Sequence, residues 1–170
     1  PTHSRRGQNI CCPWVTLFKE TEGGFLYVDP VEKRNIEYMQ IATQKPNYEY
    51  SRRNGEFNIY TNFKILHQSW ARTRSEVKQK LDNWGHSKDF DTTAYFKKWD
   101  SINYENYSDY LNVHPLFPDT WPKLKYVKGR TISEVTKNFD QASFPSLSTT
   151  DAFFKNSKFF SRLRAAINYL

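Results

Sequence analysis

The sequence predicts an α+β fold, with a small, mostly antiparallel sheet and several short helices. Apolar and polar side chains alternate over residues 57–65, which is typical of a half-buried strand. Two short apolar runs, at 14–18 and 25–28, are joined by Thr-Glu-Gly-Gly and predict a β-hairpin, because such loops need residues that tolerate positive φ. The apolar residues over 75–84 have helical spacing and predict the first helix.

The strand over 57–66 and the helix over 75–84 are expected to pack against each other. Thr73 and Glu76 have the spacing of a capping box at the start of the helix, and Gly85 is expected to end it in a left-handed cap. The apolar residues of both elements should then be buried together, and these are Phe57, Ile59, Phe63, Ile65, Val77, Leu81 and Trp84.

The other segments before residue 128 carry weaker signals. Residues 1–13 are interpreted as an irregular basic lead-in, and residues 31–43 fit a helix or a strand. Residues 47–56 are interpreted as a polar loop, whose Arg52 and Arg53 could hold an anionic or sugar ligand. Asp91 is placed to cap a second helix, which places the Asp-Phe-Asp motif at a helix start and not at the end of a strand.

We divide the chain into residues 1–128 and a C-terminal region, 129–170. The latter begins with a Ser/Thr-rich stretch to residue 150, interpreted as a loop, and ends in an amphipathic helix over 151–170. That helix has a basic polar face, so it either packs on the domain, which we expect, or lies on an anionic membrane surface.

Charge and cysteine content limit the partners and the compartment. The net charge of +7 and the pI of about 9.3 favour anionic partners: nucleoside diphosphates, nucleic acid or anionic lipid. The two cysteines, Cys11 and Cys12, are adjacent and do not suit a disulfide, which indicates a reducing, cytoplasmic compartment. No apolar run is long enough to span a membrane, so any membrane association is expected to be peripheral.

Two segments carry a resemblance to a known family. Residues 65–101, ILHQSWARTRSEVKQKLDNWGHSKDFDTTAYFKKWDS, and residues 114–127, HPLFPDTWPKLKYV, resemble the C-terminal part of bacterial and viral glycosyltransferases of the GT-A type. The similarity extends more loosely back to Trp14. It implies the acceptor-side half of an enzyme that transfers a sugar from a nucleotide-sugar to a glycan or protein acceptor.

The resemblance also implies a site. His67 would contribute to a divalent metal site, for Mn²⁺ or Mg²⁺, and this only if a nucleotide-binding half supplies the carboxylates. Trp70, Arg72 and Arg74 follow His67 closely and are the expected substrate-binding residues, together with Arg52 and Arg53 of the polar loop. Cations there would neutralise the charge that develops on the leaving nucleoside diphosphate. The other interpretation of His67 is a histidine with a structural role.

Two other classes of function stay open. The chain fits a non-enzymatic subunit of a larger assembly, such as a virion, ribosomal or organellar complex, in which basic, aromatic loops contact a neighbour. It also fits a basic nucleic-acid-binding module. Specific recognition of nucleic acid is not expected, because the second helix is mostly aromatic where base-reading side chains should lie.

Overall fold

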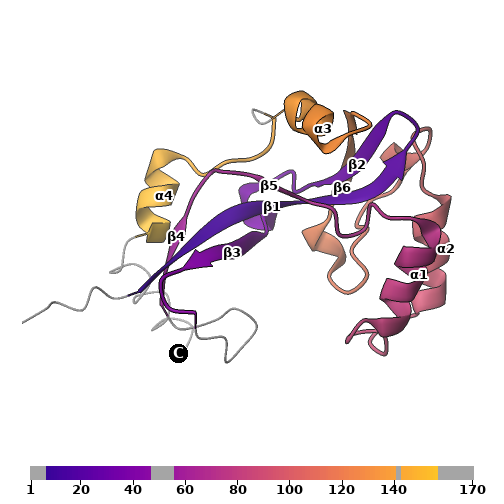
Figure 1. The fold of residues 1–170 in the computed structure, drawn as a ribbon, viewed down its shortest axis with the longest axis horizontal. Helices are drawn as coiled ribbons and strands as arrows, with labels where there is room; N and C mark the ends of the chain where they lie inside the picture. Colours follow the sequence, from indigo (N-terminus) through magenta and orange to yellow (C-terminus); the bar gives the residue numbers. More distant parts are fainter. Residues whose placement is uncertain (1–6, 47–55, 141–142, 157–170) are drawn as a thin grey trace, which may run out of the picture. The chain divides into compact units, whose positions relative to one another are not determined.

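The computed structural model describes residues 7–46, 56–140 and 143–156 (Figure 1). The strands are β1 (Gln8–Thr21), β2 (Gly24–Asp29), β3 (Tyr38–Thr43), β4 (Phe57–Tyr60), β5 (Ile65–His67) and β6 (Lys123–Lys128). The helices are α1 (Arg74–Asn83), α2 (Thr92–Ser101), α3 (Ile132–Asn138) and α4 (Thr149–Asn156), with short 3-10 helices η1 (Lys33–Asn35), η2 (Tyr107–Asp109) and η3 (Pro118–Thr120). A mostly antiparallel open sheet with a few helices agrees with the predicted α+β class.

The chain divides into two compact units, and the long strand β1 contributes to both. The first unit comprises residues 1–14, 37–65 and 146–170, and the second comprises residues 15–36 and 66–145. This division does not coincide with the boundary expected at residue 128. The reason is that β6 and α3, which lie on either side of that position, pack against each other within the second unit.

In the first unit, the beginning of β1 pairs with β3 and β4. The β1–β3 pairing is antiparallel and the β1–β4 pairing is parallel. Asn9 is buried there, and its side-chain amide donates a 2.8 Å hydrogen bond to Oδ1 of Asn58 on β4. The irregular lead-in predicted for residues 1–13 is therefore wrong from Gln8 onward, because this stretch has ladder partners on two neighbouring strands.

The single strand predicted over residues 57–66 is interrupted between β4 and β5. The side chain of Asn62 accepts a bond from the backbone N–H of Leu147 and donates one to its carbonyl, at 3.0 and 2.9 Å. Lys64 donates to Oγ of Ser146 at 2.9 Å. These residues hold the start of the C-terminal segment, and Phe63 between them is 78% exposed. The predicted burial of Phe63 is wrong, because side-chain bonds to a distant segment replace the strand ladder.

The hairpin predicted around Gly23 and Gly24 is confirmed in the second unit. β1 and β2 are antiparallel, and Gly23 has a φ of 78°, which a residue with a side chain adopts only with strain. β6 pairs with the other edge of β2. Gly24 lies so close to β6 that a Cβ there would collide with the carbonyl oxygen of Val127 and the ring of Tyr126.

Helices α1 and α2 begin where the sequence predicted. Thr73 and Glu76 form the capping box, and Asp91 caps α2 by accepting the N–H of Ala94 at 2.9 Å. The two helices pack against each other, as Figure 1 also shows. The predicted left-handed cap at Gly85 is wrong, because the residue that follows α1, Trp84, is extended and φ of Gly85 is not positive.

An aromatic core fills the second unit between the hairpin, the two helices and β6. Val77 and Leu81 are buried in it as predicted, and Trp84 is partly buried at its edge. The strand predicted over 57–66 does not belong to this core. β4 instead contacts α4 in the first unit, so the expected pairing of that strand with α1 is not found. The core residues are Phe18, Leu26, Val28, Trp70, Val77, Leu81, Tyr95, Trp99, Ile102, Val113, Trp121 and Leu124.

The region after residue 128 contains more helix than the sequence predicted. The Ser/Thr-rich stretch holds α3, which Thr131 caps by accepting the N–H of Glu134 at 3.2 Å. This correction follows from a Thr-Ile-Ser-Glu capping pattern that the Ser/Thr content of the stretch obscured. Of the amphipathic helix expected over 151–170, the structure describes α4, and residues 157–170 lie outside the described residues.

Val31, two residues after the end of β2, has a left-handed backbone with a φ of 62°. Its N–H donates to Oδ1 of the buried Asp29 at 3.1 Å, which holds this conformation, while its own side chain is 45% exposed. β-branched residues are strained there, so Val31→Gly should raise the free energy of unfolding by about 0.5–1 kcal/mol in chemical denaturation. Val31→Ala, which retains a Cβ, is the control, and its free energy of unfolding should rise less. Equal stability of the glycine variant and the wild type would contradict a strained backbone.

Candidate functional site

The residues that the sequence singled out follow β5 in a short corner that leads into α1. His67 ends β5 and is half-buried, and its carbonyl accepts the N–H of Ser69 at 2.9 Å. The N–H groups of Trp70 and Ala71 then donate to the carbonyl of Leu17 on β1, at 3.3 and 3.0 Å. Backbone bonds to β1 therefore fix where the side chains of this corner lie.

Trp70 is a core residue and does not present a surface to a substrate. Its side chain is 3% exposed, and its ring makes edge contacts with three other aromatic rings, of Trp84, Tyr95 and Trp121, at centroid distances of 5.4–6.3 Å. The expectation that Trp70 binds substrate is corrected on this ground. The aromatic residue at the corner anchors the corner to the core.

Arg74 lies outside the corner and links the two helices. Its Nη2 is 3.1 Å from Oδ2 of Asp100 on α2, and its guanidinium lies over the ring of Phe96 at 5.6 Å. The predicted substrate contact of Arg74 would have to compete with this ion pair. The charge of Arg74 is therefore largely engaged within the unit.

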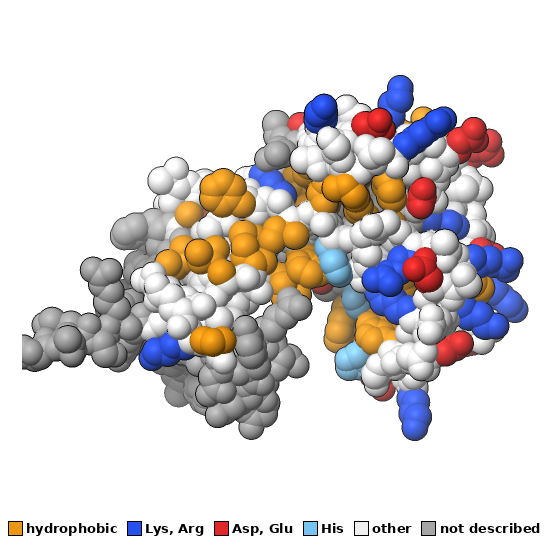
Figure 2. Space-filling view, in the orientation of Figure 1, with side chains coloured by type: hydrophobic (Ala, Val, Ile, Leu, Met, Phe, Trp, Pro, Cys, Tyr) orange, Lys and Arg blue, Asp and Glu red, His pale blue; other side chains and the backbone are white. Residues whose placement is uncertain are grey.

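Arg72 and Lys80 bring two positive charges together at the corner. Arg72 is exposed, and Lys80 reaches back from α1 to donate to Oγ and the carbonyl oxygen of Ser69, at 2.6 and 3.0 Å. The ammonium group of Lys80 also lies 4.1 Å from the ring centroid of Trp70. We call Ser69, Arg72 and Lys80 the basic corner. Figure 2 shows Lys and Arg side chains on the surface over α1 and α2, interspersed with Asp and Glu side chains.

The electrostatics of Lys80 differ from those of an ordinary surface lysine. Burial, and secondarily the nearby positive charge of Arg72, lower the pKa of Lys80 to about 8. An anion bound beside Lys80 and Arg72 would attract both side chains and so offset the repulsion between them. From the sequence, Lys80 is a possible phosphate contact only in the nucleic-acid-binding alternative and is not among the expected substrate-binding residues; its position on α1 next to the buried Val77 and Leu81 is the signal that could have added it to them.

His67 alone does not fit a site for Mn²⁺ or Mg²⁺. These hard cations prefer several oxygen ligands, whereas His67 supplies one nitrogen. Within residues 7–46, 56–140 and 143–156, no group of three or more His, Cys, Asp or Glu side chains is arranged to hold a metal ion. The donor set that the structure describes therefore does not form a metal centre around His67.

The remaining predictions of sites and partners concern the polar loop and the C-terminal helix. Arg52, Arg53 and the basic residues of the helix after position 156 lie outside the described residues. In the described part of the chain, no helix combines the length and the apolar character needed to cross a membrane. Cys11 and Cys12 are both buried as free thiols, and Sγ of Cys12 is 3.1 Å from Oγ1 of Thr61.

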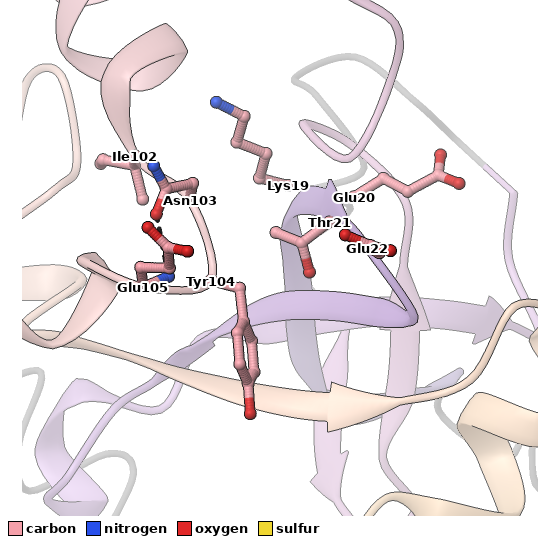
Figure 3. A pocket seen from close by; sticks show the side chains of 8 residues that line it. All are labelled: Lys19, Glu20, Thr21, Glu22, Ile102, Asn103, Tyr104 and Glu105. Carbon is pink, nitrogen blue, oxygen red and sulfur yellow. Dashed lines mark hydrogen bonds between the residues drawn. The ribbon is translucent and has the colours of Figure 1, made fainter.

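A hollow of about 510 Å³ lies elsewhere in the second unit, where the end of β1 faces the loop after α2. In Figure 3, the side chains of Glu22 and Glu105 extend from opposite walls, and Glu20 points away. The amine of Lys19 leaves the hollow to donate to the carbonyls of Trp99 and Asp100, at 2.8 and 2.7 Å. The hollow is thus acidic and exposed, the opposite in charge of the basic corner, and no sequence motif predicted it.

His114, in the second resembling segment, has a structural role. Its Nδ1 accepts the N–H groups of Leu116 and Phe117, at 3.1 and 2.9 Å, and its ring lies against Trp121. Burial lowers the pKa of His114 to about 4. The ring is therefore neutral near pH 7, and it holds the turn that follows it.

Comparison of the chain with models of known protein families, with curated proteins and with solved structures finds no match.

Proposed function

We propose that this chain is the acceptor-side, C-terminal part of a GT-A-type glycosyltransferase, and that its basic corner contacts the diphosphate of a nucleotide-sugar. The observation that carries the proposal is the pair of like charges on Arg72 and Lys80, close enough for one to lower the pKa of the other. The two positive charges repel each other in the free protein, and a bound polyanion would offset that repulsion.

The packing of the resembling segments supports the proposal. Residues 66–101 and 114–127, which are all of the two resembling segments except Ile65, belong to the second unit. They supply most of its aromatic core, namely Trp70, Val77, Leu81, Tyr95, Trp99, Trp121 and Leu124. The resemblance therefore covers residues that fold together, as expected for a shared structural unit and not for a scattered motif.

The chemistry of sugar transfer gives the basic corner its role. Negative charge develops on the diphosphate as the bond to the sugar breaks, and fixed cations lower the energy of that transition state. Arg72 can bind two phosphate oxygens through its planar guanidinium, and Lys80 adds a point charge beside it. A divalent metal enters this proposal only together with a nucleotide-binding segment that provides carboxylate ligands.

One observation favours a second function, that of a subunit in a larger assembly. In the first unit, Ile10, Ile41 and Phe63 are 41%, 49% and 78% exposed, and Figure 2 shows hydrophobic side chains at the surface over its strands. Exposed apolar groups of this kind are common at interfaces. The two functions separate in experiment, because an assembly role does not require the basic corner to bind phosphate.

Binding of inorganic pyrophosphate and of UDP tests the proposal directly. Both should bind to the full chain in titration calorimetry, and Arg72→Gln should weaken each by about tenfold to a hundredfold, the loss of one charge-assisted contact. Mn²⁺ on its own should not raise the melting temperature of this chain, and a joint effect of Mn²⁺ and UDP that His67→Ala removes is expected only when a nucleotide-binding segment supplies the carboxylate ligands.

Lys78→Gln is the matched control, because Lys78 is an exposed lysine on the same helix. It should leave pyrophosphate affinity within about twofold of the wild type. An equal loss in the Lys78 and Arg72 variants would mean that binding reflects net charge alone, and the proposal would fail. So would the absence of any binding at millimolar pyrophosphate.

A further inference from the structure

Two tyrosine rings of the first unit converge on one face of its sheet. Tyr38 on β3 pairs with Pro13, and Tyr60 on β4 pairs with Cys11. Because successive side chains of a strand alternate between faces, positions 11 and 13 of β1 place both tyrosines on the same side of the sheet. The ring centroids are 5.1 Å apart and the ring planes are perpendicular, at 90°. The two rings therefore form the walls of a corner, which we call the tyrosine cage.

The amine of Lys155 lies in the tyrosine cage. α4 lies against β4 (Figure 1), and the Nζ atom of Lys155 is 4.2 Å from the ring centroid of Tyr38 and 4.5 Å from that of Tyr60. At such distances the quadrupole of an aromatic ring attracts a cation. The tyrosine cage therefore already holds a cation, which the chain itself supplies.

The tyrosine cage suits a quaternary ammonium group better than it suits Lys155. A primary ammonium group is strongly hydrated and has three N–H donors, which aromatic faces satisfy poorly. A trimethylammonium group has no N–H donor, and it contacts the rings with methyl groups over which the positive charge is spread. The side chains of Tyr38, Tyr60 and Lys155 are each only partly buried, so a ligand from solvent can reach the cage once Lys155 moves aside.

One polar atom of the tyrosine cage indicates what else the ligand carries. The hydroxyl group of Tyr38 is buried, and within the described residues it has no hydrogen-bond partner. A buried hydroxyl group without a partner is costly, because it has lost its bonds to water. An oxygen atom a few bonds away from the charged nitrogen of the ligand would supply the missing partner. Choline has its hydroxyl group two carbons from its trimethylammonium group and fits this description.

We propose that the tyrosine cage is a binding site for a choline-type quaternary ammonium compound, and that Lys155 is a tethered competitor that fills the site in the free chain. The ligand displaces Lys155 and places its trimethylammonium group between the rings of Tyr38 and Tyr60. The site belongs to the first unit, so the inference does not depend on the basic corner, which belongs to the second.

Choline provides the test, with the full chain at constant ionic strength. In titration calorimetry, Lys155→Ala should bind choline about tenfold more tightly than the wild type, because the tethered amine no longer competes. Adding Tyr60→Leu to Lys155→Ala should weaken binding by about tenfold, because one of the two cation–ring contacts is lost. Tyr104→Leu is the matched control, since it removes a 52% exposed tyrosine of the second unit and should leave the affinity unchanged.

A neutral isostere of choline, 3,3-dimethylbutanol, separates recognition of the charge from apolar contact without a further change in the chain. It has the shape of choline, and it should bind to Lys155→Ala about tenfold more weakly than choline. Cosedimentation of the chain with phosphatidylcholine vesicles, reversed by free choline, would assign the group to a lipid headgroup. Choline binding without cosedimentation would assign it to a free ligand.

Equal affinities of Lys155→Ala for choline and for its neutral isostere would overturn the inference. So would an affinity for choline that is the same in Lys155→Ala and in the wild type, or the absence of binding by Lys155→Ala at millimolar choline. Circular dichroism and the melting temperature check that each variant folds. Choline binding in a chain that does not bind pyrophosphate would reject the proposed function and leave this inference intact.

Discussion

Replacing Trp70 with alanine is expected to lower the free energy of unfolding by about 3–5 kcal/mol, the loss typical of a buried tryptophan. Trp70 is 3% exposed and touches the rings of Trp84, Tyr95 and Trp121. Its removal leaves a cavity at the point where α1, α2 and the corner after β5 meet. Denaturation by urea, followed by tryptophan fluorescence and circular dichroism, measures the loss.

Leu111→Ala is the comparison for this variant. Leu111 belongs to the same unit and is 53% exposed, so its truncation should cost less than about 0.5 kcal/mol. A cost for Trp70→Ala near that of Leu111→Ala would show that Trp70 is not packed as described. Trp70 would then again be available as a residue that binds substrate.

Acidification should destabilise the second unit between about pH 6.5 and pH 4 through His114. The folded pKa is lowered to about 4, so the unfolded chain takes up the proton first as the pH falls. Stability from this group is complete above the unfolded pKa of about 6.5 and is lost as the pH falls toward 4. The loss should amount to at most about 1.4 kcal/mol per pH unit, measured as the free energy of unfolding in urea at each pH.

His114→Asn separates this effect from general acid denaturation. The asparagine carbonyl oxygen can accept the same N–H groups of Leu116 and Phe117 without titrating, so the slope in this range should decrease. His86, which is exposed and 2.7 Å from Asp89, provides the contrast, because His86→Asn should leave the His114 slope in place. An unchanged slope in His114→Asn would assign the pH dependence to other groups.

Local signals in the sequence were sufficient for much of the second unit. The capping box at Thr73, the cap at Asp91 and the glycine turn each act over three or four residues, and each is where the pattern predicted. The burial of Val77 and Leu81 follows from helical periodicity for the same reason. Features that depend only on neighbouring residues in the sequence can be predicted without knowing the fold.

Features that depend on contacts between distant segments could not be predicted from the sequence. Asn62 bonds to Leu147, 85 residues away, and that contact breaks a strand whose alternation looked continuous. Arg74 pairs with Asp100 on the next helix, and the pKa of Lys80 is lowered by burial and by Arg72 only when the corner folds back on α1. The sequence therefore could not show which of the residues near 67–80 are buried, which are paired and which are exposed.

The close approach of β2 and β6 at Gly24 constrains what natural variants of this protein can contain. The Cβ of any other residue at this position would overlap with the carbonyl oxygen of Val127 and the ring of Tyr126. Chains that share this three-stranded arrangement should therefore carry glycine at the matching position even where the rest of the hairpin has diverged. Gly85, which has open space around it, should vary freely in the same set of chains, so the two positions together would identify true relatives in an alignment.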